Sequence, residues 1–94
     1  MTFKEIMDFI QSGDCKFKFS WIDKQTYGLL NRESDTIFIN YHLLMAEILV
    51  HEILHHTTGS DSERLINRKT NLILKKLTVD EIKKIVLEAL IEED

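Results

Sequence analysis

The sequence predicts an α+β fold in which one helix and a group of short strands precede three further helices. From Cys15 to Trp21, apolar and polar residues alternate, which is typical of a half-buried strand. In the N-terminal and C-terminal segments, apolar residues recur at helical spacing instead. The strands follow one another before the last helices begin, and this order favours α+β over an alternating α/β fold.

The N-terminal half is expected to hold one helix and a small three-stranded sheet. Apolar residues from Phe3 to Ile10 predict a helix over about 3–11, which the run Ser12-Gly13-Asp14 ends. Strands are expected at 15–21, 27–30 and 36–39. The polar run 31–35 separates the last two strands and predicts a hairpin.

Three helices are expected in the C-terminal half. The first, over about 41–56, is apolar around most of its circumference, which is typical of a central helix covered on several sides, and Gly59 is placed to end it. The second covers about 61–77 with Ser60 or Asp61 as its N-cap, and a capping box from Thr78 to Glu81 starts the third. The residues expected to face inward on the last two helices are Leu65, Ile66, Leu72, Ile73, Leu77, Ile82, Ile85, Val86, Ala89 and Leu90.

Length and charge limit the classes of function. Ninety-four residues leave room for one domain, which we assign to residues 1–94. Twelve Lys and Arg against sixteen Asp and Glu disfavour a nucleic-acid partner, because no basic stripe can displace counterions. The single cysteine, Cys15, fits a reducing compartment. No apolar stretch is long enough to span a bilayer, so we expect a cytoplasmic protein with no membrane partner.

The four histidines all lie between positions 42 and 56, and two of them form the sequence His51-Glu52-Ile53-Leu54-His55. Residues four apart on a helix project from the same face, so both imidazoles can reach one zinc ion. Glu52 is rotated by about 100° from His51 and stands beside that ion, where it can take a proton from metal-bound water. The alternative is a structural helix with buried histidines and no metal.

A catalytic zinc site needs a third protein ligand, for which His56, Asp61 and Glu63 are candidates. His56 points about 100° away from the neighbouring ligand along the helix. If the chain reverses at Thr58-Gly59-Ser60, Glu63 falls in the first turn of the next helix and faces back toward the imidazoles. Asn67, one turn further, could hydrogen-bond a ligand imidazole. The alternative for Glu63 is a favourable charge at a helix N-terminus.

These residues resemble the motifs of gluzincin metallopeptidases, which pair H-E-x-x-H with a glutamate helix bearing Glu-x-x-x-Asp/Asn, here Glu63 to Asn67. The order of elements is similar to that of the minigluzincins and of small ImmA/IrrE-like metallopeptidase domains. The resemblance implies a minimal zincin-like domain with one Zn²⁺ per chain held by His51, His55 and Glu63. It also implies Glu52 as general base and a peptide or protein as substrate. Because some small zincins are zymogen-like, a latent or inactive zinc-binding regulatory protein is the alternative.

A metzincin is excluded on two departures from its pattern. The spacing from His51 to Asp61 fits the metzincin pattern H-E-x-x-H-x-x-G-x-x-H/D. The pattern requires a glycine at position 58, however, where this chain has Thr58, and Gly59 comes one position later. No methionine follows the motif, so the Met-turn is missing.

Further candidate residues are more weakly indicated. Tyr41, His56 and Arg64 are candidates to stabilise an oxyanion beside the zinc, although each residue type is more often found at a surface or capping position. Glu47, four residues before His51, either orients that imidazole or is a solvated charge. By resemblance to zincins, Thr36-Ile37-Phe38-Ile39 is a candidate edge strand that receives extended substrate, with a core strand as the alternative. A free hairpin edge can also pair with another copy, so we expect a monomer or a weak homodimer.

Overall fold

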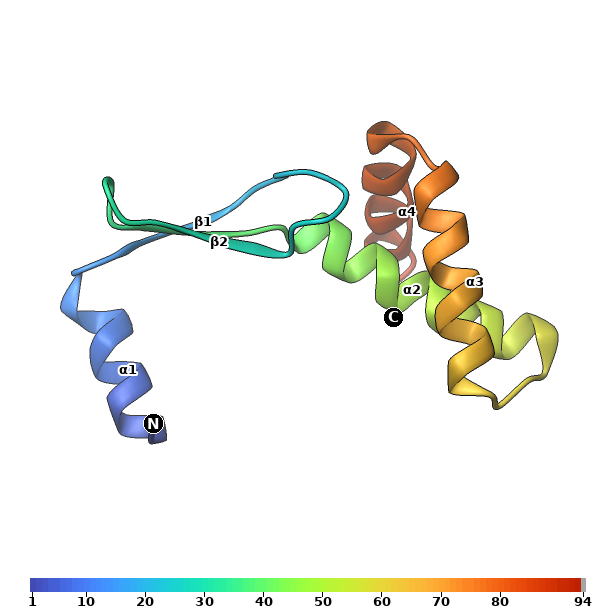
Figure 1. Cartoon of the computed structure of the whole chain (residues 1–94), viewed down its shortest axis with the longest axis horizontal. Helices are drawn as coiled ribbons and strands as arrows, with labels where there is room; N and C mark the ends of the chain where they lie inside the picture. The colour runs from blue at the N-terminus through green and yellow to red at the C-terminus, as the bar shows by residue number, and fades with distance from the viewer. Residues whose placement is uncertain (94) are drawn as a thin grey trace.

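The computed structural model describes residues 1–93 and confirms the α+β class. Its elements in chain order are α1 (Phe3–Ser12), β1 (Lys16–Phe19), β2 (Gly28–Asn31), β3 (Thr36–Ile39), α2 (Tyr41–Thr58), α3 (Glu63–Lys76) and α4 (Val79–Ile91). Figure 1 shows α1 and the sheet at one end of an elongated molecule and the other three helices at the opposite end. The described chain extends over 46 × 29 × 29 Å. No helix among the described residues is long and apolar enough to cross a membrane.

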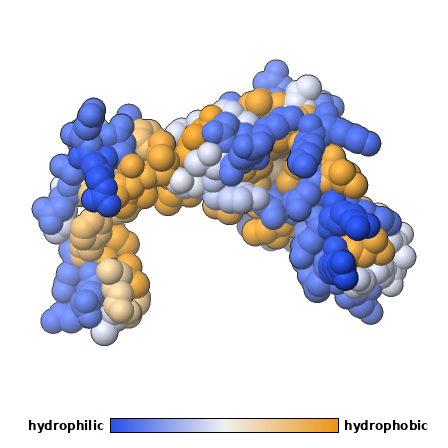
Figure 2. All heavy atoms as spheres, in the orientation of Figure 1, coloured by the Kyte–Doolittle hydropathy of each residue, from blue (hydrophilic) through white to orange (hydrophobic). Residues whose placement is uncertain are grey.

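Helix α1 has strong local signals at both ends but no extensive contact with another described element. Thr2 accepts a hydrogen bond from the backbone N–H of Glu5 and forms a capping box with it, and Gly13 ends the helix with a left-handed φ of 77°. None of the residues of α1 is buried. Figure 2 shows an apolar surface that runs from α1 onto the sheet. Local capping therefore explains why α1 is helical, whereas its apolar face is left uncovered.

The three strands form one mixed sheet in the order β1-β3-β2. β2 and β3 are antiparallel and form the predicted hairpin, while β1 pairs with the other side of β3 in parallel. The expectation that Thr36–Ile39 is an edge strand is therefore wrong. Both sides of β3 are hydrogen-bonded to neighbouring strands, so its backbone has no groups left for an extended substrate.

Asn40 joins the sheet to the helices. Its side chain is fully buried, and its Nδ2 donates hydrogen bonds to the carbonyl oxygens of Asp23 at 2.8 Å and Thr26 at 3.0 Å. Its backbone N–H donates to the carbonyl oxygen of Tyr27 at 2.9 Å. These three bonds hold the loop between β1 and β2 against Asn40, the residue that directly precedes α2, and they fix where α2 begins.

Helix α2 packs against both α3 and α4 and confirms the prediction of a central helix. The residues that form the buried cluster are Ala46, Val50, Leu74, Ile82 and Val86. Ile48 and Ile53, however, are 62% and 53% exposed, so α2 is not covered all round. Two neighbouring helices can cover only two sides of a third, and the rest of the apolar surface of α2 stays open to solvent.

The buried face of α3 agrees only in part with the predicted one: Ile66 is buried, and Ile73 and Leu77 pack against the buried cluster, as predicted. Ile66, Thr70 and Leu74 are buried, one turn apart, whereas Leu65 and Leu72 are exposed. A buried threonine is tolerated because its hydroxyl donates to the carbonyl oxygen of Ile66 at 2.8 Å. A polar residue therefore lies on the buried side of α3, which the apolar pattern alone could not indicate.

The ends of α3 and α4 are capped by two hydroxyl side chains. α3 begins one residue after Ser62, whose hydroxyl is its N-cap, instead of after Ser60 or Asp61. Thr78 and Glu81 form the predicted capping box of α4. On α4, Ile82 and Val86 are buried as predicted, but Leu90 is 46% exposed.

Removal of Ile82 from the cluster tests this account of the core. Ile82 is fully buried, so Ile82→Ala is expected to lower the free energy of unfolding by about 2–5 kcal/mol through lost burial and a cavity. Ile91→Ala, at a position 72% exposed on the same helix, is expected to change it by less than about 0.5 kcal/mol. Urea unfolding followed by circular dichroism measures both, and equal effects would contradict the assigned core.

Candidate metal centre

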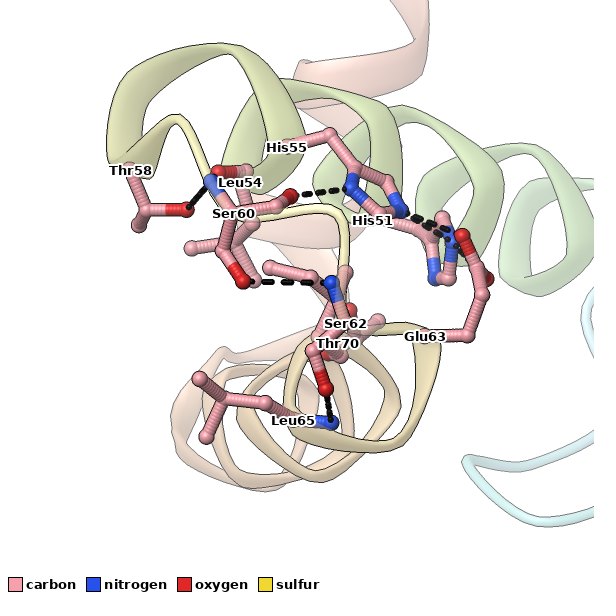
Figure 3. A network of polar contacts seen from close by, with 10 residues as sticks. His51, Leu54, His55, Thr58, Ser60, Ser62, Glu63, Leu65 and Thr70 are labelled. Carbon is pink, nitrogen blue, oxygen red and sulfur yellow. Dashed lines mark hydrogen bonds and ion pairs between the residues drawn. The ribbon is translucent and has the colours of Figure 1, made fainter.

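Three side chains from two helices converge at the start of α3. The Nε2 atoms of His51 and His55 lie 3.2 Å apart on one face of α2. Glu63, the first residue of α3, places one carboxylate oxygen 3.0 Å from the Nε2 of His51 and the other 2.7 Å from the Nε2 of His55. Figure 3 shows the two rings and the carboxylate directed at one another. The sequence-predicted ligands are therefore brought together.

The geometry of this triad (His51, His55 and Glu63) fits a tetrahedral metal ion. Ligand atoms at 2.0–2.1 Å from a tetrahedral zinc ion lie about 3.3 Å from one another. The two Nε2 atoms lie 3.2 Å apart, close to this ideal, and one ligand atom from each of the three residues can be chosen within 4.8 Å of the others. The two short approaches of Glu63, at 3.0 Å and 2.7 Å, are made by its two different oxygens. Small side-chain rotations would open the triad enough to admit the ion.

The ring of His55 is held in the tautomer that metal binding needs. Its Nδ1 lies 2.7 Å from the carbonyl oxygen of Ser60, which can only accept a hydrogen bond. Nδ1 therefore carries a proton, and in the neutral ring the lone pair lies on Nε2, the atom that would bind the metal. The same hydrogen bond is the main reason why the pKa of His55 is raised, against the opposing effect of partial burial; the charges of Glu63 and Glu52 contribute further.

The turn between α2 and α3 positions both the Ser60 carbonyl and Glu63. Gly59 adopts a left-handed φ of 68°, which ends α2 as predicted, and its N–H donates to the carbonyl oxygen of His55 at 3.1 Å. The hydroxyl of Thr58 donates to the carbonyl oxygen of Leu54 at 2.6 Å and accepts from the N–H of Ser60 at 3.2 Å. The chain then reverses and α3 begins with its first carboxylate facing α2.

Glu52 lies beside the triad without belonging to it. Its side chain is exposed, and helical geometry rotates it about 100° from His51. Its negative charge is the weakest of the influences that raise the pKa of His55, and its carboxylate is not among the three potential ligand groups. The carboxylate therefore remains free to accept a proton.

Asn67 is not brought to either imidazole. It lies exposed on α3, and among the described residues its side chain makes no hydrogen bond to His51 or His55. The hydrogen bond that we expected from Asn67 is supplied to His55 by the Ser60 carbonyl. A backbone carbonyl carries no signal in the sequence, which is why it was missed.

The three candidate oxyanion residues lie in different places. Tyr41 is the first residue of α2, ten positions and therefore about 15 Å along the helix from His51, and its ring lies against that of His42. His56 is exposed on the last turn of α2. Arg64 follows Glu63 on α3 and lines a shallow surface hollow with Arg68. Only His56 and Arg64 adjoin a ligand residue in the chain.

The structure also adds a contact that the sequence did not indicate. The hydroxyl of Tyr27 donates a hydrogen bond to the carboxylate of Glu47, one helical turn before His51. This carboxylate raises the pKa of Tyr27 to about 12. Glu47 therefore serves the junction between the sheet and α2 instead of orienting His51 or remaining solvated.

The triad predicts tight zinc binding that depends on each ligand. Zinc affinity is expected to fall by more than about 100-fold in each of the variants His51→Ala, His55→Ala and Glu63→Ala. This loss is larger than the 10–100-fold loss that follows removal of a side chain that only hydrogen-bonds a ligand. His56→Ala is expected to leave the affinity unchanged, because this exposed side chain lies outside the triad. Titration against a competing chelator measures all four, and an equal loss in His56→Ala would contradict the assigned ligand set.

The place of Asn67 gives a second test. Because Ser60 supplies the outer hydrogen bond, Asn67→Ala is expected to change the zinc affinity by less than about 3-fold, where an outer-shell partner would cost 10–100-fold. The same chelator titration applies, and a loss of 10-fold or more would restore the expected role of Asn67.

Comparison of the chain with family models, curated proteins and solved structures gave no match.

Proposed function

We propose that this chain is a zinc-dependent peptidase with Glu52 as its general base. The observation that carries the proposal is the convergence of His51, His55 and Glu63 beside an exposed carboxylate that is not a ligand. Structural zinc sites use four protein ligands, whereas catalytic sites use three and leave a position open. Three ligands with a free base therefore favour catalysis over a structural role.

The zinc ion, when bound, would supply two effects: it lowers the pKa of a water molecule toward about 7 and polarises a carbonyl group. His51 and His55 would bind it through Nε2 and Glu63 through its carboxylate. Glu63 also compensates part of the ion's positive charge. The Ser60 carbonyl keeps His55 in the required tautomer throughout.

Glu52 would move the proton. Its carboxylate accepts a proton from the attacking water as the oxygen bonds to the carbonyl carbon of the substrate. The protonated Glu52 then donates this proton to the amide nitrogen as the C–N bond breaks. The products are a carboxylic acid and an amine, and Glu52 returns to its charged form.

Two features support a peptide or protein as the substrate. The site lies at the surface, since the Glu63 side chain is 67% exposed and both histidine side chains retain 18% exposure, so a polymer can reach it. The motif pair in residues 51–67 is also similar to that of gluzincins, which cleave peptides.

The substitution Glu52→Gln tests the mechanism. Loss of the base is expected to lower kcat/KM for peptide hydrolysis at least about 100-fold, while the zinc content stays near one per chain. Glu33→Gln, at an exposed position in the turn between β2 and β3, is expected to leave both quantities unchanged. A peptide library with mass-spectrometric detection gives the rates. Unchanged hydrolysis by Glu52→Gln would exclude Glu52 as the base.

One observation favours the second candidate, a latent or inactive zinc-binding regulatory protein. Zincin-like peptidases are expected to hold substrate on an edge strand, but β3 is central in this sheet. Stoichiometric zinc without hydrolysis of any library peptide would favour this second function over the first.

A further inference from the structure

Two apolar surfaces among the described residues are open to solvent. The first is the apolar stripe of α1, in which Phe3, Ile6 and Ile10 are 80%, 43% and 47% exposed. The second is a groove of about 540 Å³ between α2 and α4, whose apolar lining consists of Leu49, Ile53, Leu77, Ile85 and Ala89. Charged side chains such as Lys84 and Glu88 form its rim.

The exposed area of this chain is large for its mass. A compact monomer of 11.1 kDa exposes roughly 5,700 Å², whereas this chain exposes 7308 Å². Its radius of gyration is 16.2 Å, against about 12 Å for a compact domain of this length. The excess of about 1,600 Å² per chain exceeds the ~800 Å² that each partner buries in a standard protein interface.

We propose that two copies of this chain form a homodimer in which α1 of each copy docks in the α2–α4 groove of the other. The stripe of α1 has the spacing of a helix that binds in a groove. Phe3, Ile6, Met7 and Ile10 stand at positions i, i+3, i+4 and i+7, which place them along one side of the helix. Each dimer would then contain two equivalent helix–groove contacts, as two-fold symmetry requires.

A second copy is the occupant that leaves this fold intact. Only three residues, 13–15, separate α1 from β1, so α1 can pivot but not travel far from the start of that strand. β1 is hydrogen-bonded along β3, and Figure 1 shows that it starts at the end of the sheet remote from α2 and α4. For α1 to reach the groove of its own chain, β1 would have to leave the sheet.

Docking of α1 would leave the metal triad accessible. Leu49 and Ile53 each lie two positions from His51, which is a rotation of about 200° around α2. The groove and the triad are therefore on opposite sides of the same helix. Dimerisation and zinc binding can consequently be measured and disrupted independently.

Sedimentation equilibrium of the zinc-loaded full chain tests the proposal, with an expected mass twice that of one chain. Ile6→Glu on α1 and Ala89→Arg in the groove are each expected to raise the dimer Kd at least about 30-fold, the effect of losing one interface hot spot. Gln11→Glu adds the same charge as Ile6→Glu at a polar position of α1 and is expected to leave the dimer unchanged. Ile6→Glu cannot disturb the core, because α1 contributes no buried residue.

A mixture of the two variants gives the sharpest result. The Ile6→Glu chain keeps its groove and the Ala89→Arg chain keeps its helix, so a heterodimer with one intact contact is expected where neither variant dimerises alone. If the unsubstituted chain is a monomer, the proposal is overturned. This holds whether X-ray scattering gives the monomer a radius of gyration near 16 Å or a smaller one. A dimer that survives Ala89→Arg would also overturn it in favour of pairing through α1 alone or a sheet edge. The zinc titrations are read separately, so none of these results bears on the proposed peptidase.

Discussion

The reversal of the chain between α2 and α3 is the constraint on which the metal centre depends. Gly59 takes a left-handed backbone conformation that other residues adopt only at a cost, and it stops α2 one turn after His55. The next residue, Ser60, then directs its carbonyl oxygen at the Nδ1 of His55. Three residues later, Glu63 opens α3 and faces the same imidazoles. One turn therefore supplies both the third ligand and the tautomer of the second.

The helical part and the N-terminal part of the chain are stabilised differently. α2, α3 and α4 share a buried apolar cluster, whereas α1 buries nothing and the sheet is a single layer. The two parts are joined by the polar contacts of buried Asn40, by the hydrogen bond from Tyr27 to Glu47, and by Trp21, which packs against the buried cluster. The polar contacts set an orientation with little burial of apolar area. This explains how a chain with a small core can have so large an exposed apolar surface.

Sequence patterns predicted most elements, because each rests on local physics. The capping box from Thr78 to Glu81 and the glycine at position 59 act on their own backbone, and both are where the sequence places them. The predictions that were wrong concern contacts between one element and another. The sequence placed Leu72 inward and did not indicate Thr70, yet α3 buries the threonine, because packing against α2 selects the face. Likewise, the strand at 36–39 was found, but not its central position in the sheet.

The sequence by itself determined the pair of imidazoles on one face of α2 and the carboxylate beside them, because residues at i, i+1 and i+4 have a fixed geometry on any helix. Only the tertiary structure decided that Glu63, and not Asp61 or His56, completes the triad, because that depends on how the turn after α2 directs α3. It also decided that β3 is enclosed by two strands and that α1 is left uncovered. These outcomes depend on contacts between segments distant in the chain, which local spacing does not encode.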